Sequence, residues 1–168
     1  LEYAHHRMIG AEALVRWRHP KKGLVSPATF IPMLEKSDCI GIVDRFVFDK
    51  VCSCIRKWDT CGEQMVPISV NLSRNDVYKG DICRKLLEIL QQHQVSPQSV
   101  HLEITESAYI ENAACLSEAL AQLQQAGFRV EMDDFGSGYS SLNVLKDIPV
   151  DQLKLDMDFL KGSYDSPK

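Results

Sequence analysis

The sequence predicts an α/β protein built as an incomplete TIM-like (β/α) barrel, and three observations support this prediction. Strand-like and helix-like segments alternate along the 168 residues, which favours parallel strands joined by helices. Apolar and polar side chains also alternate inside the strand-like segments, so each strand has two different faces. Acidic residues lie toward the carboxyl ends of these strands, where a barrel of this kind builds its active site. We therefore expect about five strands in a single partial domain, residues 1–168.

The first half of the chain begins with the strand-like run MIGAEALVRW at residues 8–17. Ser26 and Pro27 then mark a helix start, because serine can cap a helix and proline is favoured at its first position. Residues 42–58 predict an amphipathic helix. Its apolar side chains recur at Ile42, Phe46, Val51, Ile55 and Trp58. A second strand, PISVNLS, is expected at residues 67–73.

The second half repeats the same pattern of helix followed by strand. The remaining helices are expected at residues 82–93, 114–127 and 140–147, and the remaining strands at residues 99–106, 128–134 and 151–156. Gly127 ends the second of these helices, since glycine readily adopts the left-handed conformation found at helix ends.

The composition argues against two classes of partner. With 23 acidic and 19 basic side chains and a net charge of −4, the chain lacks the basic character of proteins that bind nucleic acid polymers. No stretch approaches the roughly 20 apolar residues that cross a bilayer, so we expect no membrane contact from this segment. Six cysteines form no C-x-x-C pair. We interpret them as reduced, buried side chains of a cytoplasmic protein, whose parent chain can still be membrane-anchored.

The alternation places the polar side chains of each strand on one face. Glu103 shares its face with His101 and Thr105, and Asp133 shares its face with Glu131. Half-solvated strands of an ordinary sheet would give the same pattern, and that alternative stays open. A parallel sheet with helices on its apolar face seldom leaves the other face bare, so we favour a barrel whose polar faces point to one axis.

Seven side chains on these polar faces and strand ends can carry chemistry. They are Glu12, Asn71, Glu103, Asp133, Asp134, Lys154 and Asp156. Carboxylate and amide oxygens are hard ligands that suit Mg²⁺ or Mn²⁺. Two such ions about 3.5–4 Å apart can activate water and stabilise a leaving oxygen in phosphodiester cleavage. Asp133 and Asp134 could serve both ions only if their strand bends, since neighbours in a regular strand point to opposite faces.

Each of these residues also has a simpler interpretation. A single inward glutamate can be an ion-pair partner, Asn71 can cap a turn, and Lys154 can be a counter-ion to Asp133. Asp133 and Asp134 are more suggestive because Gly136-Ser137-Gly138 follows, and glycines let backbone amides approach a phosphate. The triplet Asp-Phe-Gly also occurs in protein kinases, but the glycine-rich nucleotide loop and the H-R-D segment of kinases are absent.

Five ordered motifs resemble the EAL-domain family of bacterial cyclic di-GMP phosphodiesterases. They are GAEALVRWRHP, VNLS, LEITES, DDFGSGYSSL and QLKLD. The resemblance covers nearly the whole chain, and the family's signature tripeptide is Glu12-Ala13-Leu14. It implies a (β/α) barrel that opens cyclic di-GMP to linear pGpG with two Mg²⁺ or Mn²⁺ ions.

The same resemblance implies a role for each matching position. The metal ligands would be Glu12, Asn71, Glu103, Asp133 and Asp134, with Asp134 serving the second ion. The catalytic residues would be Lys154, which positions or activates water, together with Glu12 and Asp134. Leu14 and Arg16 would contact substrate, and Glu106 would stabilise the loop that follows the Asp-Asp strand.

A barrel of this family has about 250 residues and eight strands, so the resemblance implies further strands ahead of Leu1 and after Phe159. One of these strands would bring another glutamate to the site. The resemblance also implies a homodimer and neighbouring GGDEF or sensory domains in the parent protein. The alternative function is a catalytically silent cyclic di-GMP receptor or signalling scaffold. A purely structural half-barrel is a third possibility, and it would bind neither metal nor nucleotide.

Overall fold

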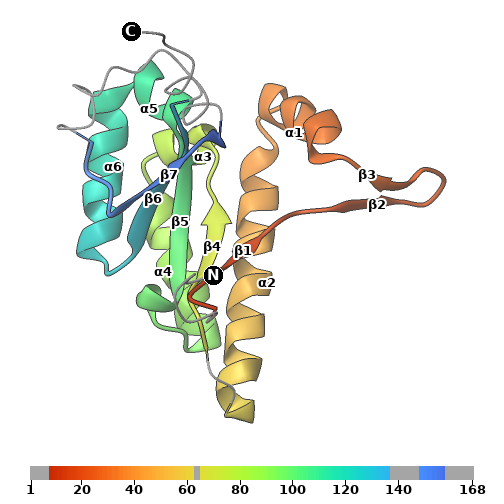
Figure 1. The fold of residues 1–168 in the computed structure, drawn as a ribbon, viewed down its shortest axis with the longest axis vertical. Helices are drawn as coiled ribbons and strands as arrows, with labels where there is room; N and C mark the ends of the chain where they lie inside the picture. Colours follow the sequence, from red (N-terminus) through yellow and green to blue (C-terminus); the bar gives the residue numbers. More distant parts are fainter. Residues whose placement is uncertain (1–7, 63–64, 137–147, 158–168) are drawn as a thin grey trace, which may run out of the picture.

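A five-stranded parallel sheet forms the centre of the molecule. The computed structural model describes residues 8–62, 65–136 and 148–157. The strands lie in the order in which they occur along the chain, β1-β4-β5-β6-β7, and every neighbouring pair is parallel (Figure 1). They are β1 (Ala11–Ala13), β4 (Ile68–Asn71), β5 (Val100–Thr105), β6 (Arg129–Phe135) and β7 (Gln152–Leu155). This arrangement is a half-barrel and confirms the predicted fold class.

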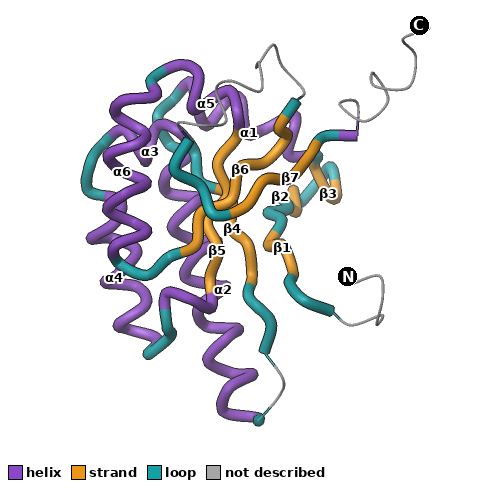
Figure 2. The backbone as a smooth tube through the Cα atoms, turned by 60° about the vertical axis from the view of Figure 1, so that its left-hand side comes forward, coloured by secondary structure: helices purple, strands orange, loops and turns teal. Residues whose placement is uncertain are grey.

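Three long helices cover one face of this sheet (Figure 2). They are α2 (Ile40–Cys61), α4 (Ile82–His93) and α6 (Ala113–Gln125). Between the helices and the sheet lies the core, in which Val70, Leu102 and Val130 from the strands are fully buried. These are the apolar positions that the alternation assigned to the helix side, so the opposite face carries the polar side chains.

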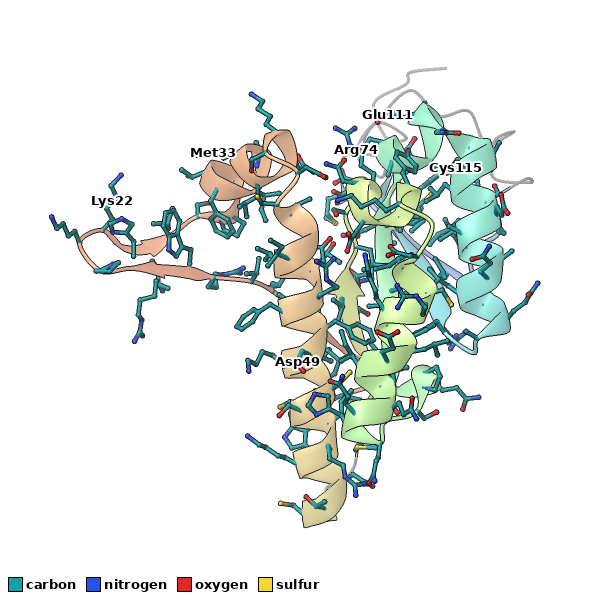
Figure 3. All side chains as sticks on the ribbon, turned by 180° about the vertical axis from the view of Figure 1, so that it is seen from behind. Lys22, Met33, Asp49, Arg74, Glu111 and Cys115 are labelled. Atoms are coloured by element: carbon teal, nitrogen blue, oxygen red, sulfur yellow. The ribbon has the colours of Figure 1, made fainter. Side chains whose placement is uncertain are left out.

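Short elements at the carboxyl ends of the strands shape the polar edge of the sheet. They are the hairpin of β2 (Trp17–His19) and β3 (Gly23–Val25), and the helices α1 (Pro27–Lys36), α3 (Arg74–Tyr78) and α5 (Glu106–Glu111). A 3₁₀ turn, η1 (Pro97–Ser99), precedes β5. The hairpin, with Lys22 near its tip, projects away from the sheet (Figure 3). Among these elements, only α1 was expected from the sequence.

The prediction of one strand at residues 8–17 was wrong. Only Ala11–Ala13 pair with β4, after which the chain leaves the sheet and Trp17 starts the antiparallel hairpin. The indole of Trp17 packs edge-on against Phe30, with ring centroids 5.9 Å apart. Contact with α1 therefore directs Trp17 away from the sheet, although its side chain fits a strand pattern equally well.

The predicted helix at residues 42–58 exists as α2, but its buried face was assigned incorrectly in part. Val51 and Ile55 are buried as expected, whereas Ile42 and Phe46 are 63% and 57% exposed. Apolar residues occupy two neighbouring stripes of this helix, and spacing alone cannot tell which stripe meets the sheet. Phe48 lies on the same stripe as Val51 and Ile55, and it is fully buried.

Four further predictions concerned the cap of α1, the cysteines, a helix at residues 140–147 and the absence of a membrane span. Ser26 is the N-cap of α1, but its side chain makes no capping hydrogen bond. All six cysteines are free, yet only Cys52 is buried and Cys61 is exposed. The expected helix at residues 140–147 lies outside the described residues. Among the helices that are described, none is long and apolar enough to cross a bilayer.

Gly41 provides a stability test of the packing between α2 and α3. A Cβ added at Gly41 would overlap the buried carboxylate of Asp76, which Arg45 holds at 2.8 Å. We expect Gly41→Ala to lower the free energy of unfolding by about 1–3 kcal/mol, because the carboxylate cannot move without breaking this pair. Urea denaturation measures the change.

The matched control is Gly10→Ala, whose added Cβ would come no closer than 3.6 Å to the Pro67 carbonyl oxygen. If Gly41 had room for a methyl group, Gly41→Ala would stabilise α2, because alanine normally stabilises a helix interior relative to glycine. A rise in stability of Gly41→Ala would therefore contradict the packing described here.

Candidate active site

The register of the sheet brings Glu12 and Asn71 into contact at the β1 edge. Glu12 pairs with Ser69 on β4, and Asn71 follows one polar position further along that strand. The Asn71 amide nitrogen donates a hydrogen bond to Glu12 Oε1 at 3.0 Å. Both side chains are exposed, so their oxygens remain open to a ligand.

Glu103 and Lys154 form the centre of the site. Glu103 is directly opposite Asn71 in the register and is 0% exposed. The Lys154 ammonium, carried by β7, donates a hydrogen bond to Glu103 Oε1. The second oxygen, Oε2, has no hydrogen-bond partner among the described residues. A buried carboxylate oxygen without a donor is a strong candidate ligand for a cation, because its desolvation is otherwise uncompensated.

Glu131 is a second buried carboxylate that the sequence analysis did not select. It lies opposite Glu103 on β6 and is 3% exposed. Ser69 Oγ donates to Glu131 Oε2 at 2.9 Å, and His101 Nδ1 lies 2.6 Å from Oε1. Lys154 Nζ also lies 3.4 Å from Oε2. The alternation of apolar and polar residues had placed Glu131 on the polar face, and this position was the sequence signal that could have selected it as a site residue.

Asp133 and Asp134 lie where β6 bends. Between Met132 and Phe135 the pairing with β7 shifts its register, so two aspartates oppose the single residue Lys154. Asp134 takes a left-handed conformation with φ 55°. A bulge of this kind bends a strand and interrupts the strict alternation of its side chains, which is the condition under which Asp133 and Asp134 could serve one site.

The electrostatics of the site are dominated by negative charge. Burial, followed by the neighbouring carboxylates of Asp134, Glu12 and Glu131, raises the pKa of Asp133 above its usual value. Burial also lowers the pKa of Lys154, and the negative charge of Glu12 opposes this effect. One ammonium thus stands among several carboxylates, which leaves an excess of negative charge.

The donor set fits divalent cations of the Mg²⁺ or Mn²⁺ type. Its ligands are carboxylate and amide oxygens, and Glu103 Oε2 is a buried oxygen without a donor. Within residues 8–62, 65–136 and 148–157, no three His, Cys, Asp or Glu side chains are already gathered as a metal-binding group. The ammonium of Lys154 occupies Glu103 Oε1, so an ion on the free Oε2 would share this carboxylate with a like charge.

Glu106 is joined to the end of the Asp-Asp strand. It was expected at the end of a strand but is the first residue of α5, and it is buried. Its Oε2 accepts a hydrogen bond from the Gly136 backbone N–H at 2.8 Å. The contact fixes the first residue after β6, whereas residues 137–147, which the role implied for Glu106 concerns, lie outside the described residues.

A cleft of about 400 Å³ lies beside these strand ends, between α1, α2 and α3. Leu14 and Arg16, the residues expected to contact substrate, both line it. Arg16 is exposed, and within the described part of the chain its guanidinium donates to the neighbouring carbonyl oxygen of Val15, at 2.8 Å, and to no other acceptor. The acidic residues Glu35 and Asp44, which the sequence analysis did not select, line the same cleft. The cleft has the size and the mixed lining typical of a small-molecule site.

Asp44 is the most strongly perturbed carboxyl group of the cleft. The backbone N–H of Ser73 donates to its Oδ2 at 2.9 Å. Burial nevertheless raises the pKa of Asp44 from 3.8 to about 6, because the charged form is poorly solvated.

Comparison with known proteins identifies the family. The model of the EAL domain matches residues 1–168. The chain belongs to the EAL family. It is 38% identical over 153 residues to MucR of Pseudomonas aeruginosa, a bifunctional diguanylate cyclase/cyclic di-GMP phosphodiesterase, covering 91% of this chain and 22% of that protein. It is 31% identical over 164 residues to the cyclic di-GMP phosphodiesterase PA2567 of the same organism, covering 96% of this chain and 27% of that protein.

A solved structure agrees with this assignment. The MucR phosphodiesterase in complex with cyclic di-GMP is 36% identical and superposes with a TM-score of 0.85. The match covers 95% of this chain and 65% of that chain. The EAL domain described here therefore spans about a quarter of the length of its curated relatives and about two thirds of a solved phosphodiesterase chain.

Removing the Glu106 carboxylate tests its contact with Gly136. We expect Glu106→Ala to speed hydrogen exchange of the Gly136 amide by about tenfold or more, because that amide loses its acceptor and opens locally. Glu106→Gln is the matched control, since it retains an acceptor oxygen and should preserve much of the protection. Equal protection in Glu106→Ala and the unaltered protein would contradict the contact.

Asp44 predicts a pH-dependent stability. Its folded-state pKa is raised, so the folded state favours the protonated form, and stability is lost as pH rises from 3.8 to about 6. Above this window Asp44→Asn should be more stable than the unaltered protein by at most about 3 kcal/mol, with no advantage below it. Urea denaturation across the window measures the difference. Asp59→Asn, at an exposed position of α2, is the control. A stability gain of Asp44→Asn that does not change with pH would contradict the raised pKa of Asp44.

Proposed function

We propose that this EAL domain hydrolyses cyclic di-GMP to linear pGpG with two Mg²⁺ or Mn²⁺ ions. The observation that carries the proposal is the register that places Glu12, Asn71, Glu103 and the Asp133-Asp134 bulge along the carboxyl edge of one parallel sheet. Membership of the EAL family and the phosphodiesterase names of two relatives support it. So does the cyclic di-GMP complex of a structural neighbour.

The residues would divide the work by position. Glu12, Asn71, Glu103 and Asp133 would hold one ion and Asp134 the second, and the bound ions would polarise the phosphate and lower the pKa of the attacking water. Lys154, which bonds to Glu103, would orient that water as an ammonium, or take its proton as a neutral amine. Arg16 and Leu14 line the adjacent cleft, where Arg16 can bind a phosphate oxygen.

A second function, binding of cyclic di-GMP without cleavage, is also supported by an observation. The Lys154 ammonium occupies the central carboxylate Glu103, and no ready three-ligand metal group exists among the described residues. Such a receptor could use the cleft and Arg16 without assembling the ions. Turnover distinguishes the two functions.

Partners and location follow from the same proposal. Cyclic di-GMP is the proposed small-molecule partner. Homodimerisation and association with GGDEF or sensory domains are proposed for the parent protein, in keeping with the bifunctional name of MucR. The contact between Glu106 and Gly136 would support a dimer by fixing the start of the loop after β6. We propose a cytoplasmic location for the domain.

The decisive experiment incubates the purified protein with cyclic di-GMP and Mg²⁺ or Mn²⁺ and separates the products by chromatography. We expect pGpG, and we expect Glu12→Gln to reduce turnover by at least about 100-fold, because a lost ligand removes several kcal/mol of charge stabilisation. Glu118→Gln on the exposed face of α6 is the control and should retain full activity. Binding of cyclic di-GMP without pGpG in either metal would support the receptor instead.

A further inference from the structure

Glu131 has no role in the proposed function, yet it is among the most tightly held polar groups of the sheet. Its carboxylate is buried on the polar face, where Ser69 Oγ and His101 Nδ1 contact its two oxygens at 2.9 and 2.6 Å. Two contacts from two other strands fix its position. A buried carboxylate costs free energy unless it is paired, so its retention calls for a physical explanation.

The register of β5 and β6 shows which group makes a buried Glu131 unfavourable and which group compensates it. Glu103 and Glu131 lie directly opposite each other on adjacent strands, an unfavourable arrangement for two like charges. The Lys154 ammonium relieves it, because it bonds to Glu103 Oε1 and lies 3.4 Å from Glu131 Oε2. One cation is therefore shared unequally by two buried carboxylates.

Cation binding at Glu103 would change this sharing. A divalent ion and an ammonium repel each other and compete for the same carboxylate. Glu103 Oε1 is occupied by Lys154, whereas Oε2 has no donor among the described residues. An ion bound at Oε2 would repel the ammonium on Oε1 of the same carboxylate, and Glu131 Oε2 lies within reach of that ammonium as a second acceptor.

We propose that Glu131 is a positioning residue that receives the Lys154 ammonium from Glu103 when Glu103 binds a divalent cation. It keeps Lys154 at the edge of the metal site instead of releasing it to solvent, and it lowers the cost of displacing Lys154. Ser69 and His101 act through Glu131 by fixing its two oxygens. The inference deepens the proposed function and rests on its metal site.

The direct test is nitrogen-15 NMR of the Lys154 ammonium during titration of the protein with Mg²⁺ alone. An ammonium held in an ion pair exchanges its protons slowly and gives a visible signal, and Lys154→Met assigns it. In the unaltered protein the signal should persist at saturating Mg²⁺. In Glu131→Gln it should be present without Mg²⁺, because Glu103 holds the ammonium, and disappear when Mg²⁺ is added.

Calorimetric titration gives an independent measurement. We expect Glu131→Gln to weaken Mg²⁺ binding about tenfold, since the displaced ammonium then has no second carboxylate to receive it. Glu118→Gln on the exposed face of α6 makes the same chemical change far from the site and should leave both measurements unchanged. A purely structural Glu131 would lower the melting temperature without making the Lys154 signal depend on Mg²⁺.

Three results would overturn the inference. One is loss of the Lys154 signal in the unaltered protein at saturating Mg²⁺, which is measurable even if Glu131→Gln does not fold. Another is a Lys154 signal that responds to Mg²⁺ identically in Glu131→Gln and the unaltered protein. The third is an absence of Mg²⁺ binding, which would also remove the metal site of the proposed function. The first two leave hydrolysis of cyclic di-GMP intact, so the two failures can be told apart.

Discussion

The crowding of carboxylates around the single ammonium of Lys154 is the constraint on which the site depends. Parallel strands deliver Glu103 and Glu131 to directly opposed positions, and both are buried, so their repulsion cannot be screened by water. Lys154 relieves part of it from the neighbouring strand β7. The remaining negative charge makes this edge of the sheet electrostatically favourable for divalent cations.

The bulge in β6 solves a second geometric problem. Adjacent side chains of a regular strand point to opposite faces, and Asp133 and Asp134 could not then serve one site. The extra residue opposite Lys154 and the left-handed conformation of Asp134 remove this restriction. Glu106 then holds the chain immediately after the bulge through the Gly136 amide. Local backbone irregularity and a buried carboxylate thus act together to shape the strand end.

The half-barrel leaves apolar groups uncovered along its β1 side. Phe46 and Trp58 on α2 lie beside a groove that β1 also lines, and Lys50 stacks over the Phe46 ring. The groove adjoins the free edge of the sheet, where β1 pairs only with β4 among the described strands. The solved MucR phosphodiesterase chain is longer than this one, since the match covers 65% of it. Among the described residues, this stripe of α2 is an exposed apolar surface beside the β1 edge of the sheet.

Sequence alone was enough to predict the parallel α/β architecture, the order of the five sheet strands and three long helices, and the polar face that carries Glu103 and Asp133. Alternation and helical spacing are local properties, and they suffice for these features. Tertiary structure decided that Trp17 leaves the sheet to meet Phe30, and that α2 buries Phe48 while Phe46 stays outside. It also decided that Lys154 bonds to Glu103 and not to Asp133, and that Glu131 joins them. These outcomes depend on strand register and on which helix stripe meets the sheet, and both are set by contacts between residues far apart in the chain.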